Sequence, residues 1–247
     1  MNKFRIATIL AVASLAFGLV GAASAQDYDK SFLTDYTKLQ AKPAGTGGTE
    51  LMYIPPGVFE RLVKYNGVMV DQPEVLVSPQ SDYKGAKPHD LAAIAELLRS
   101  GLAGQLTAGG YRVVDAPGAD VIYIRMALTD LSLKKKKRGL LAYTPVGFVV
   151  KAGADAVKDM MDKYDIMSMA LQAELVDSQT NEVLAEIVAV RGGENERMDF
   201  DVLNATVNDF GSRLRCRLDN ARVPSAQQIN CLDPMARTAR EATKAAP

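Results

Sequence analysis

The sequence predicts a two-layer α/β sandwich in which a mixed, mostly antiparallel sheet of four to five strands is covered by two amphipathic helices. Two long stretches carry apolar residues every three or four positions, and several β-branched runs alternate in polarity between turn-forming residues. Two such helices pack most economically on one face of a sheet. At 247 residues, 48% of them hydrophobic, the chain is the right size for a single domain, which we place at 51–221.

The N-terminus has the features of a cleavable export signal. Lys3 and Arg5 precede an apolar run at 6–20, and Ala23-Ser24-Ala25 supplies the small residues that a signal peptidase needs. A membrane anchor is the alternative, but the run is shorter than the ~20 apolar residues that span a bilayer. We therefore expect cleavage after Ala25, a mature chain from residue 26 and a soluble, secreted protein of the periplasm.

Two further properties follow from this segment. The sequence at 19–22 is Leu-Val-Gly-Ala, so Ala22 stands where a bacterial lipoprotein carries its lipid-bearing cysteine, and lipidation at that site is excluded. The full chain has 29 basic and 29 acidic residues. Cleavage removes two basic residues and no acid, which leaves a net charge of −2 and argues against a dedicated nucleic-acid binder.

Residues 26–50 are polar and then Gly-rich, which indicates a flexible lead-in. Within them Phe32, Leu33, Tyr36 and Leu39 have helical spacing and predict one short docking turn. The C-terminal residues 222–247 form a polar, Ala-rich tail.

Between these segments the elements follow in order. A strand is predicted at 68–77, where Pro73 forces an edge position or a bulge, and a helix at 90–108 lies between Pro88 and Gly109. The remaining expected elements are a short strand at 111–114, a longer strand at 120–133, a helix near 149–161, a hairpin with strands 166–176 and 182–190, and a second amphipathic helix at 200–218.

The two cysteines are Cys216 and Cys231. In an oxidising compartment they are expected to pair, which would join the tail to the preceding helix. A loop of about fifteen residues closed in this way adds roughly 3 kcal/mol in the chain-entropy model. Two free thiols, or a catalytic redox pair, are the alternatives.

Five stretches together resemble a known family. They are the Phe-Leu-x-Asp-Tyr-x-x-Leu pattern at 32–39, Ser-Pro-Gln-Ser-Asp at 78–82, Tyr-Arg-Val-Val-Asp at 111–115, the strand at 122–131 that ends Leu-Thr-Asp-Leu, and Ala-Glu-Leu-Val-Asp-Ser-Gln-Thr at 173–180. Over roughly residues 30–220 the chain resembles the bacterial envelope family called domain of unknown function 3313. That resemblance implies a secreted α/β domain with no assigned activity, and it supplies no functional residues.

The residues for ordinary catalytic chemistry are sparse. His89 is the only imidazole, it precedes the candidate cap Asp90, and no Gly-x-Ser-x-Gly sequence occurs. There is no His pair, Cys cluster or calcium-loop pattern, so neither a metal nor another cofactor is expected.

Carboxylates are the one source of catalysis left open. Six acids fall in or beside predicted elements, but sequence does not show which of them converge: Asp82, Asp90, Asp115, Asp130, Glu174 and Asp177. Arg125 and Glu174 are charges inside apolar strands, and strict alternation favours a solvent-facing side of the sheet for them.

Five consecutive cations form the basic run, which consists of Lys134, Lys135, Lys136, Lys137 and Arg138. The run is either a solvated loop or strand extension, or a contact for anionic head groups, with the following apolar stretch inserting at the interface. We expect a non-enzymatic binding or interaction module at the cell envelope, with an envelope protein or an anionic lipid surface as partner. The alternatives are a hydrolase or other enzyme with a carboxylate-based site, and a homo-oligomeric structural protein assembled by strand addition; the oligomeric state itself is not predicted.

Overall fold

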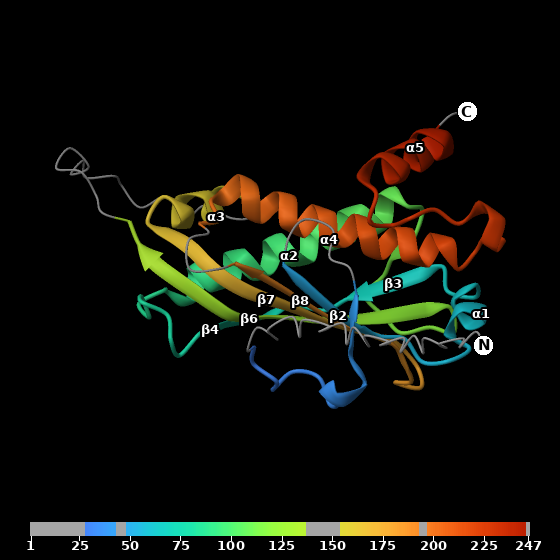
Figure 1. The fold of residues 1–247 in the computed structure, drawn as a ribbon, viewed down its shortest axis with the longest axis horizontal. Coiled ribbons are helices and arrows are strands. Elements are labelled where there is room, and N and C mark those ends of the chain that lie inside the picture. Colours follow the sequence, from blue (N-terminus) through green and yellow to red (C-terminus); the bar gives the residue numbers. More distant parts are fainter. Residues whose placement is uncertain (1–27, 43–47, 137–153, 193–196, 246–247) are drawn as a thin grey trace, which may run out of the picture.

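The structure is a computed structural model that describes residues 28–42, 48–136, 154–192 and 197–245. One large mixed sheet runs through the molecule, and helices α2 and α4 lie side by side on one of its faces (Figure 1). The expected α/β class with two covering helices is confirmed. The expected four to five strands are wrong, because the described residues form eight.

The strands are β1 (Gln40–Lys42), β2 (Thr49–Tyr53), β3 (Gly67–Val70), β4 (Glu74–Val77), β5 (Arg112–Val113), β6 (Val121–Lys135), β7 (Tyr164–Asp177) and β8 (Val183–Gly192). The helices are α1 (Val58–Leu62), α2 (Pro88–Ala108), α3 (Ala154–Met161), α4 (Phe200–Asn220) and α5 (Pro234–Ala245), with 3-10 turns at Tyr36–Lys38 and Ser225–Gln227. Within the described residues, no helix combines the length and apolar character needed to cross a membrane.

The strand order is β1-β2-β8-β7-β6-β3-β5, with β4 paired to the far half of β6. The single strand expected at 68–77 is divided at Pro73 into β3 and β4, which both run parallel to β6. Pro73 has no N–H to donate to a ladder, so the pairing stops at Val70 with Ile124 and resumes at Glu74 with Ala127, three residues further along β6. The edge strands β1, β4 and β5 are three, four and two residues long, so each offers only a short edge for strand addition.

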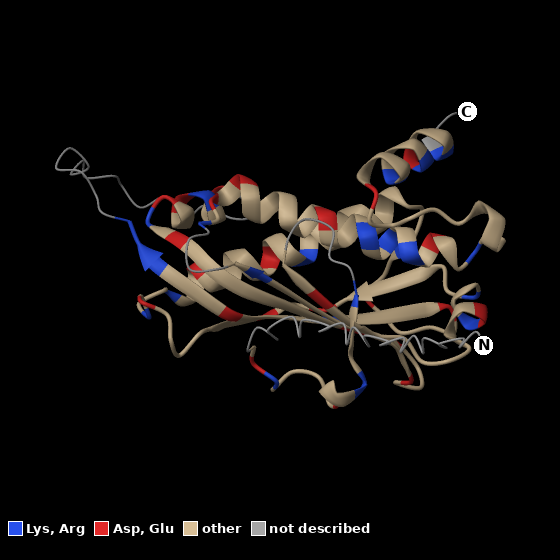
Figure 2. Cartoon of the chain, in the orientation of Figure 1, with Lys and Arg blue, Asp and Glu red and all other residues tan. Residues whose placement is uncertain are grey.

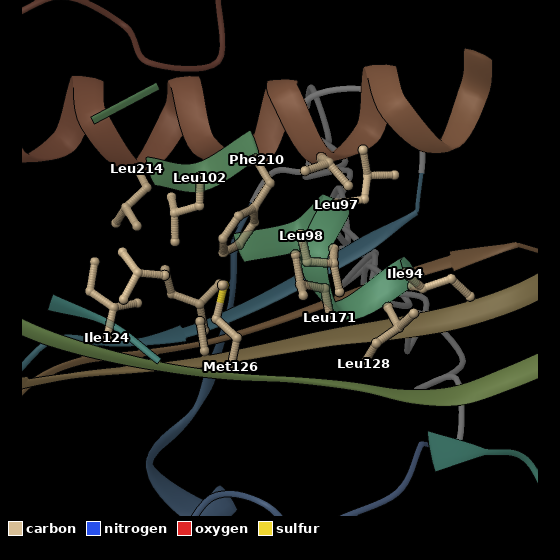
Figure 3. Close-up of a cluster of buried hydrophobic side chains, with 14 of the residues drawn as sticks. Ile94, Leu97, Leu98, Leu102, Ile124, Met126, Leu128, Leu171, Phe210 and Leu214 are labelled. Atoms are coloured by element: carbon tan, nitrogen blue, oxygen red, sulfur yellow. The ribbon is translucent and has the colours of Figure 1, made fainter. Parts of the chain in front are cut away.

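The core lies between the sheet and the two long helices. Ile94, Leu98 and Leu102 of α2 and Phe210 of α4 point onto β6 and β7, as Figure 3 shows. The helices approach closely at Gly101, where a Cβ would lie 2.7 Å from a methyl carbon of Val207. The helical spacing read from the sequence therefore identified the buried faces correctly.

The segment at 28–39, which we call the N-terminal strap, lies across the opposite face of the sheet (Figure 1). Leu33 is buried against Ala170, Val188 and Val190, and the expected docking turn is present at Tyr36–Lys38. The described parts of residues 26–50, which the sequence predicts as a flexible lead-in, form the strap, β1 and the start of β2. Leu33 and the partly buried apolar side chains around it hold the strap on the sheet.

The C-terminal residues are folded back onto α4. Cys216 of α4 and Cys231 are placed as a disulfide pair, with their Cα atoms 5.6 Å apart. Beyond them α5 stands above the end of α4 in Figure 1.

Candidate functional site

An apolar pocket opens at the end of the sheet where α1 lies. The pocket is shallow and partly open to solvent. Its lining comes from β2, α1, β7, β8 and α4 and the residues beside them: Met52, Ile54, Phe59, Leu62, Leu175, Leu184, Ala185, Ile187, Leu214, Arg217 and Leu218. Apart from Arg217, every lining side chain is apolar.

Helix α1 forms the outer wall of the apolar pocket. Gly57 starts it with a left-handed φ of 73°, a conformation that glycine adopts without strain. Val58 and Leu62 then face the core, while Phe59 and Val63, one turn apart, face outward with 47% and 54% of their surface exposed. The helix therefore presents an exposed apolar patch at the mouth of the pocket.

Charged pairs surround this patch. Arg61 of α1 pairs with Glu182, and the Lys64 Nζ lies 3.1 Å from Asp177 Oδ2. The Tyr65 hydroxyl and the amides of the hairpin turn donate to the same carboxylate, and they hold the pKa of Asp177 well below its usual range.

At the inner edge of the pocket, Glu50 of β2 is buried and accepts from Arg213 and Arg217 of α4. Burial lowers the pKa of Arg217, and the neighbouring Glu50 opposes that shift. The pocket is therefore an apolar centre with a rim of ion pairs of both signs.

The carboxylates proposed from the sequence do not meet in one cleft. Asp82 and Asp115 are exposed, Asp90 accepts from the Lys87 amide at the start of α2, and Asp177 organises the β7–β8 turn. His89 lies beside Asp90 at the surface. Within the described residues no cluster of His, Cys, Asp or Glu could hold a metal ion.

One pair of acids does meet, on the face beneath the N-terminal strap. Glu174 of β7 and Glu186 of β8 are direct cross-strand neighbours, each 3% exposed, and Arg125 pairs with Glu174 from β6. Burial raises the pKa of Glu186. The expectation that Arg125 and Glu174 face solvent is wrong for Glu174, because the strap, with Phe32 near the Arg125 guanidinium, covers this face.

Gln172 is the hydrogen-bonding centre of the strap. Its amide oxygen accepts from the Tyr36 hydroxyl at 2.6 Å, and its amide nitrogen donates to Asp29 and Thr129. Asp130, left-handed at a bulge in β6, accepts from the Asp29 amide. Sequence reasoning missed Gln172 and Glu186, although their even positions in alternating strands place them on this face.

The described part of the basic run lies at the end of β6 (Figure 2). Lys134 and Lys135 are exposed, whereas the Lys136 Nζ lies 3.5 Å from Asp165 and donates to the Met161 carbonyl. Lys137 and Arg138 lie outside the described residues. The neighbouring acid offsets part of the positive charge.

Comparisons with known proteins give one family and several distant folds. The family model described as "Protein of unknown function (DUF3313)" matches residues 28–212. No curated protein matches the chain. The PelC dodecamer from Paraburkholderia phytofirmans is 14% identical with a TM-score of 0.36, covering 66% of this chain and 93% of that one. A putative neuraminyllactose-binding hemagglutinin homolog from Helicobacter pylori is 10% identical with a TM-score of 0.35, covering 73% and 90%.

Proposed function

This chain belongs to the family of unknown function DUF3313, and we propose that it is an exported protein that binds a protein partner at the cell envelope through the apolar pocket. The observation that carries the proposal is the exposed Phe59 at the mouth of a pocket whose lining, apart from Arg217, is apolar. The surrounding pairs, Arg61 with Glu182 and Lys64 with Asp177, provide the polar rim that protein interfaces have around an apolar centre. An apolar side chain of the partner would fill the pocket.

A binding role fits this site better than catalysis does. General acid–base chemistry needs groups within reach of a substrate, and the apolar pocket contributes no carboxylate and a single charged side chain, Arg217. Glu174 and Glu186 are adjacent but covered by the N-terminal strap. These two features support an interaction protein over the carboxylate-based enzyme.

The predicted export supports the choice of an envelope partner. The N-terminal pattern with cleavage after Ala25 predicts it, and the pairing of Cys216 with Cys231 is consistent with an oxidising compartment. Mass measurement of the protein recovered from a periplasmic fraction tests this step. A mature chain that begins at residue 26 is expected, and an uncleaved chain in the cytoplasm would overturn it.

In-cell photocrosslinking tests the pocket itself. A photocrosslinking amino acid in place of Phe59 should form one discrete protein adduct, whereas the same amino acid in place of Val202, an exposed α4 residue at 44%, should not. Adding Val63→Asp should reduce the yield at position 59 at least fivefold, because it places a charge in the apolar patch, and Val202→Asp should leave it unchanged.

Three results would refute the proposal. They are the absence of any adduct at position 59, equal yields in the Val63→Asp and Val202→Asp backgrounds, and an adduct of twice the chain mass. The last would instead indicate the homo-oligomer.

A further inference from the structure

A second pocket lies at the C-terminal end of the molecule, between α5 and the ends of α2 and α4. The pocket is shallow and partly open to solvent. Its lining includes four cations and two acids: Arg215, Arg237, Arg240, Lys244, Asp219 and Glu241. We call it the basic pocket. The ribbon of this half of α4 and of α5 carries several blue segments, which mark Lys and Arg, in Figure 2.

The internal ion pairs leave a surplus of positive charge. Glu241 pairs with Arg215, and Asp219 Oδ2 lies 2.8 Å from the Lys244 Nζ. Arg237 pairs with Asp209, which lies outside the lining and also pairs with Arg213. The two carboxylates of the lining are thus matched to two of its four cations.

Arg240 differs from the other lining cations. Within the described residues, its side chain donates hydrogen bonds only to neutral acceptors. Its guanidinium donates to Asn220 Oδ1 at 2.8 Å and to the Gln227 carbonyl at 2.9 Å. The guanidinium is held in place by neutral groups and keeps its whole charge available to a ligand. Its position is part-buried at the wall of the pocket, on the helix turn next to Glu241.

The floor of the basic pocket strengthens its attraction for an anion. The side chains of Arg215 and Arg237 are 5% and 7% exposed. Burial, together with repulsion from Arg237, lowers the pKa of Arg215. Cations outnumber acids in this concave lining, so the site has a net positive potential, and an entering anion relieves the repulsion between Arg215 and Arg237.

We propose that the basic pocket binds a phosphate group, with Arg240 and Lys244 at its mouth and Arg215 at its floor, where the phosphate replaces Glu241. With Glu241 displaced, Arg215 and Arg240 present two positive charges, which match a phosphate dianion better than a single carboxylate. Planar guanidinium groups also bind phosphate oxygens in pairs. Free phosphate and the phosphomonoester head group of a lipid share this chemistry.

The test uses two variants of opposite expected effect, both at half-exposed or part-buried surface positions. Titration calorimetry with inorganic phosphate, at constant ionic strength set by chloride, should show about tenfold weaker binding for Arg240→Gln. Glu241→Gln should bind several-fold tighter, because it removes the carboxylate that competes for Arg215. A gain in affinity cannot come from misfolding.

Matched controls come from the exposed pair Arg99 and Glu96 on α2, whose side chains are 41% and 40% exposed. Arg99→Gln and Glu96→Gln change the net charge equally and should leave phosphate affinity unchanged. Equal affinities for Arg240→Gln and Arg99→Gln, or for Glu241→Gln and Glu96→Gln, would overturn the proposal.

Vesicles identify the source of the phosphate. Binding to phosphatidic acid vesicles, lost in Arg240→Gln and absent with phosphatidylcholine, would assign the site to a lipid head group. Binding of inorganic phosphate without vesicle binding would assign it to a free ligand. Binding of neither by the parent protein would refute the inference.

Discussion

Replacing Tyr36 by Phe should detach the N-terminal strap from the sheet while leaving the helical layer intact. The Tyr36 hydroxyl donates to Gln172 Oε1 at 2.6 Å and accepts from the amides of Phe32 and Leu33 at 3.1 and 2.9 Å. One oxygen atom therefore joins the strap to itself and to β7. The substitution removes that atom and keeps the aromatic ring.

The size of the effect follows from these three bonds. Each contributes about 1 kcal/mol net, and the buried Gln172 oxygen loses a partner that it cannot replace without water. The strap amides are part-buried and regain some hydration in the variant. The free energy of local opening of the strap should therefore fall by about 2–3 kcal/mol. That corresponds to roughly 30- to 150-fold faster hydrogen exchange at the amides of residues 32 and 33.

Native-state hydrogen exchange measured residue by residue is the assay. Tyr53→Phe serves as the control, because this tyrosine faces the same side of the sheet and its hydroxyl has no hydrogen-bond partner among the described residues. Less than a threefold change at residues 32 and 33, or an equal change in Tyr53→Phe, would show that the hydroxyl does not hold the strap.

Three further predictions follow. Glu186→Gln should raise Tm at neutral pH, because a buried acid with a raised pKa stabilises the fold below its unfolded pKa and loses that contribution as pH rises; the gain in Tm of the variant over the parent should therefore be larger at pH 7 than at pH 4, and an equal or smaller gain would contradict this reasoning. Reducing Cys216–Cys231 should lower stability by about 3 kcal/mol and free α5 for proteolysis, whereas unchanged cleavage would show that ion pairs suffice. Lys134→Gln with Lys135→Gln should weaken binding to anionic vesicles at low salt if the basic run contacts lipid, and equal binding by parent and variant would exclude that contact.

The elements that sequence predicted correctly are those whose signal is local. Helices α2 and α4 each repeat an apolar position every three or four residues over 21 residues, and the β7–β8 hairpin has turn formers between two alternating runs. The missed strands are short, and their pairing partners are distant in sequence. Leu51 of β2 pairs with Val188 of β8, and nothing in five residues specifies that partner.

The candidate sites depended on distant contacts in the same way. The apolar pocket draws on five elements whose leucines and isoleucines have the same pattern as core residues. The basic pocket needs Arg215 of α4 and Arg240 of α5 to converge, and the two are scattered single cations in the sequence. The basic run, conspicuous in sequence, has one of its lysines engaged by Asp165.

Sequence by itself determined the class of the fold, the buried faces of the long helices and the two cysteines able to pair; export remains its prediction. These features depend on periodicity, composition and order along the chain, and such signals are present before any tertiary contact forms. Only the tertiary structure decided which side of the sheet meets water. Glu174 alternates as a surface residue should, yet it is buried, because the N-terminal strap closes the face that two helices leave open. Burial depends on what packs above a residue, and that contact joins segments more than a hundred residues apart.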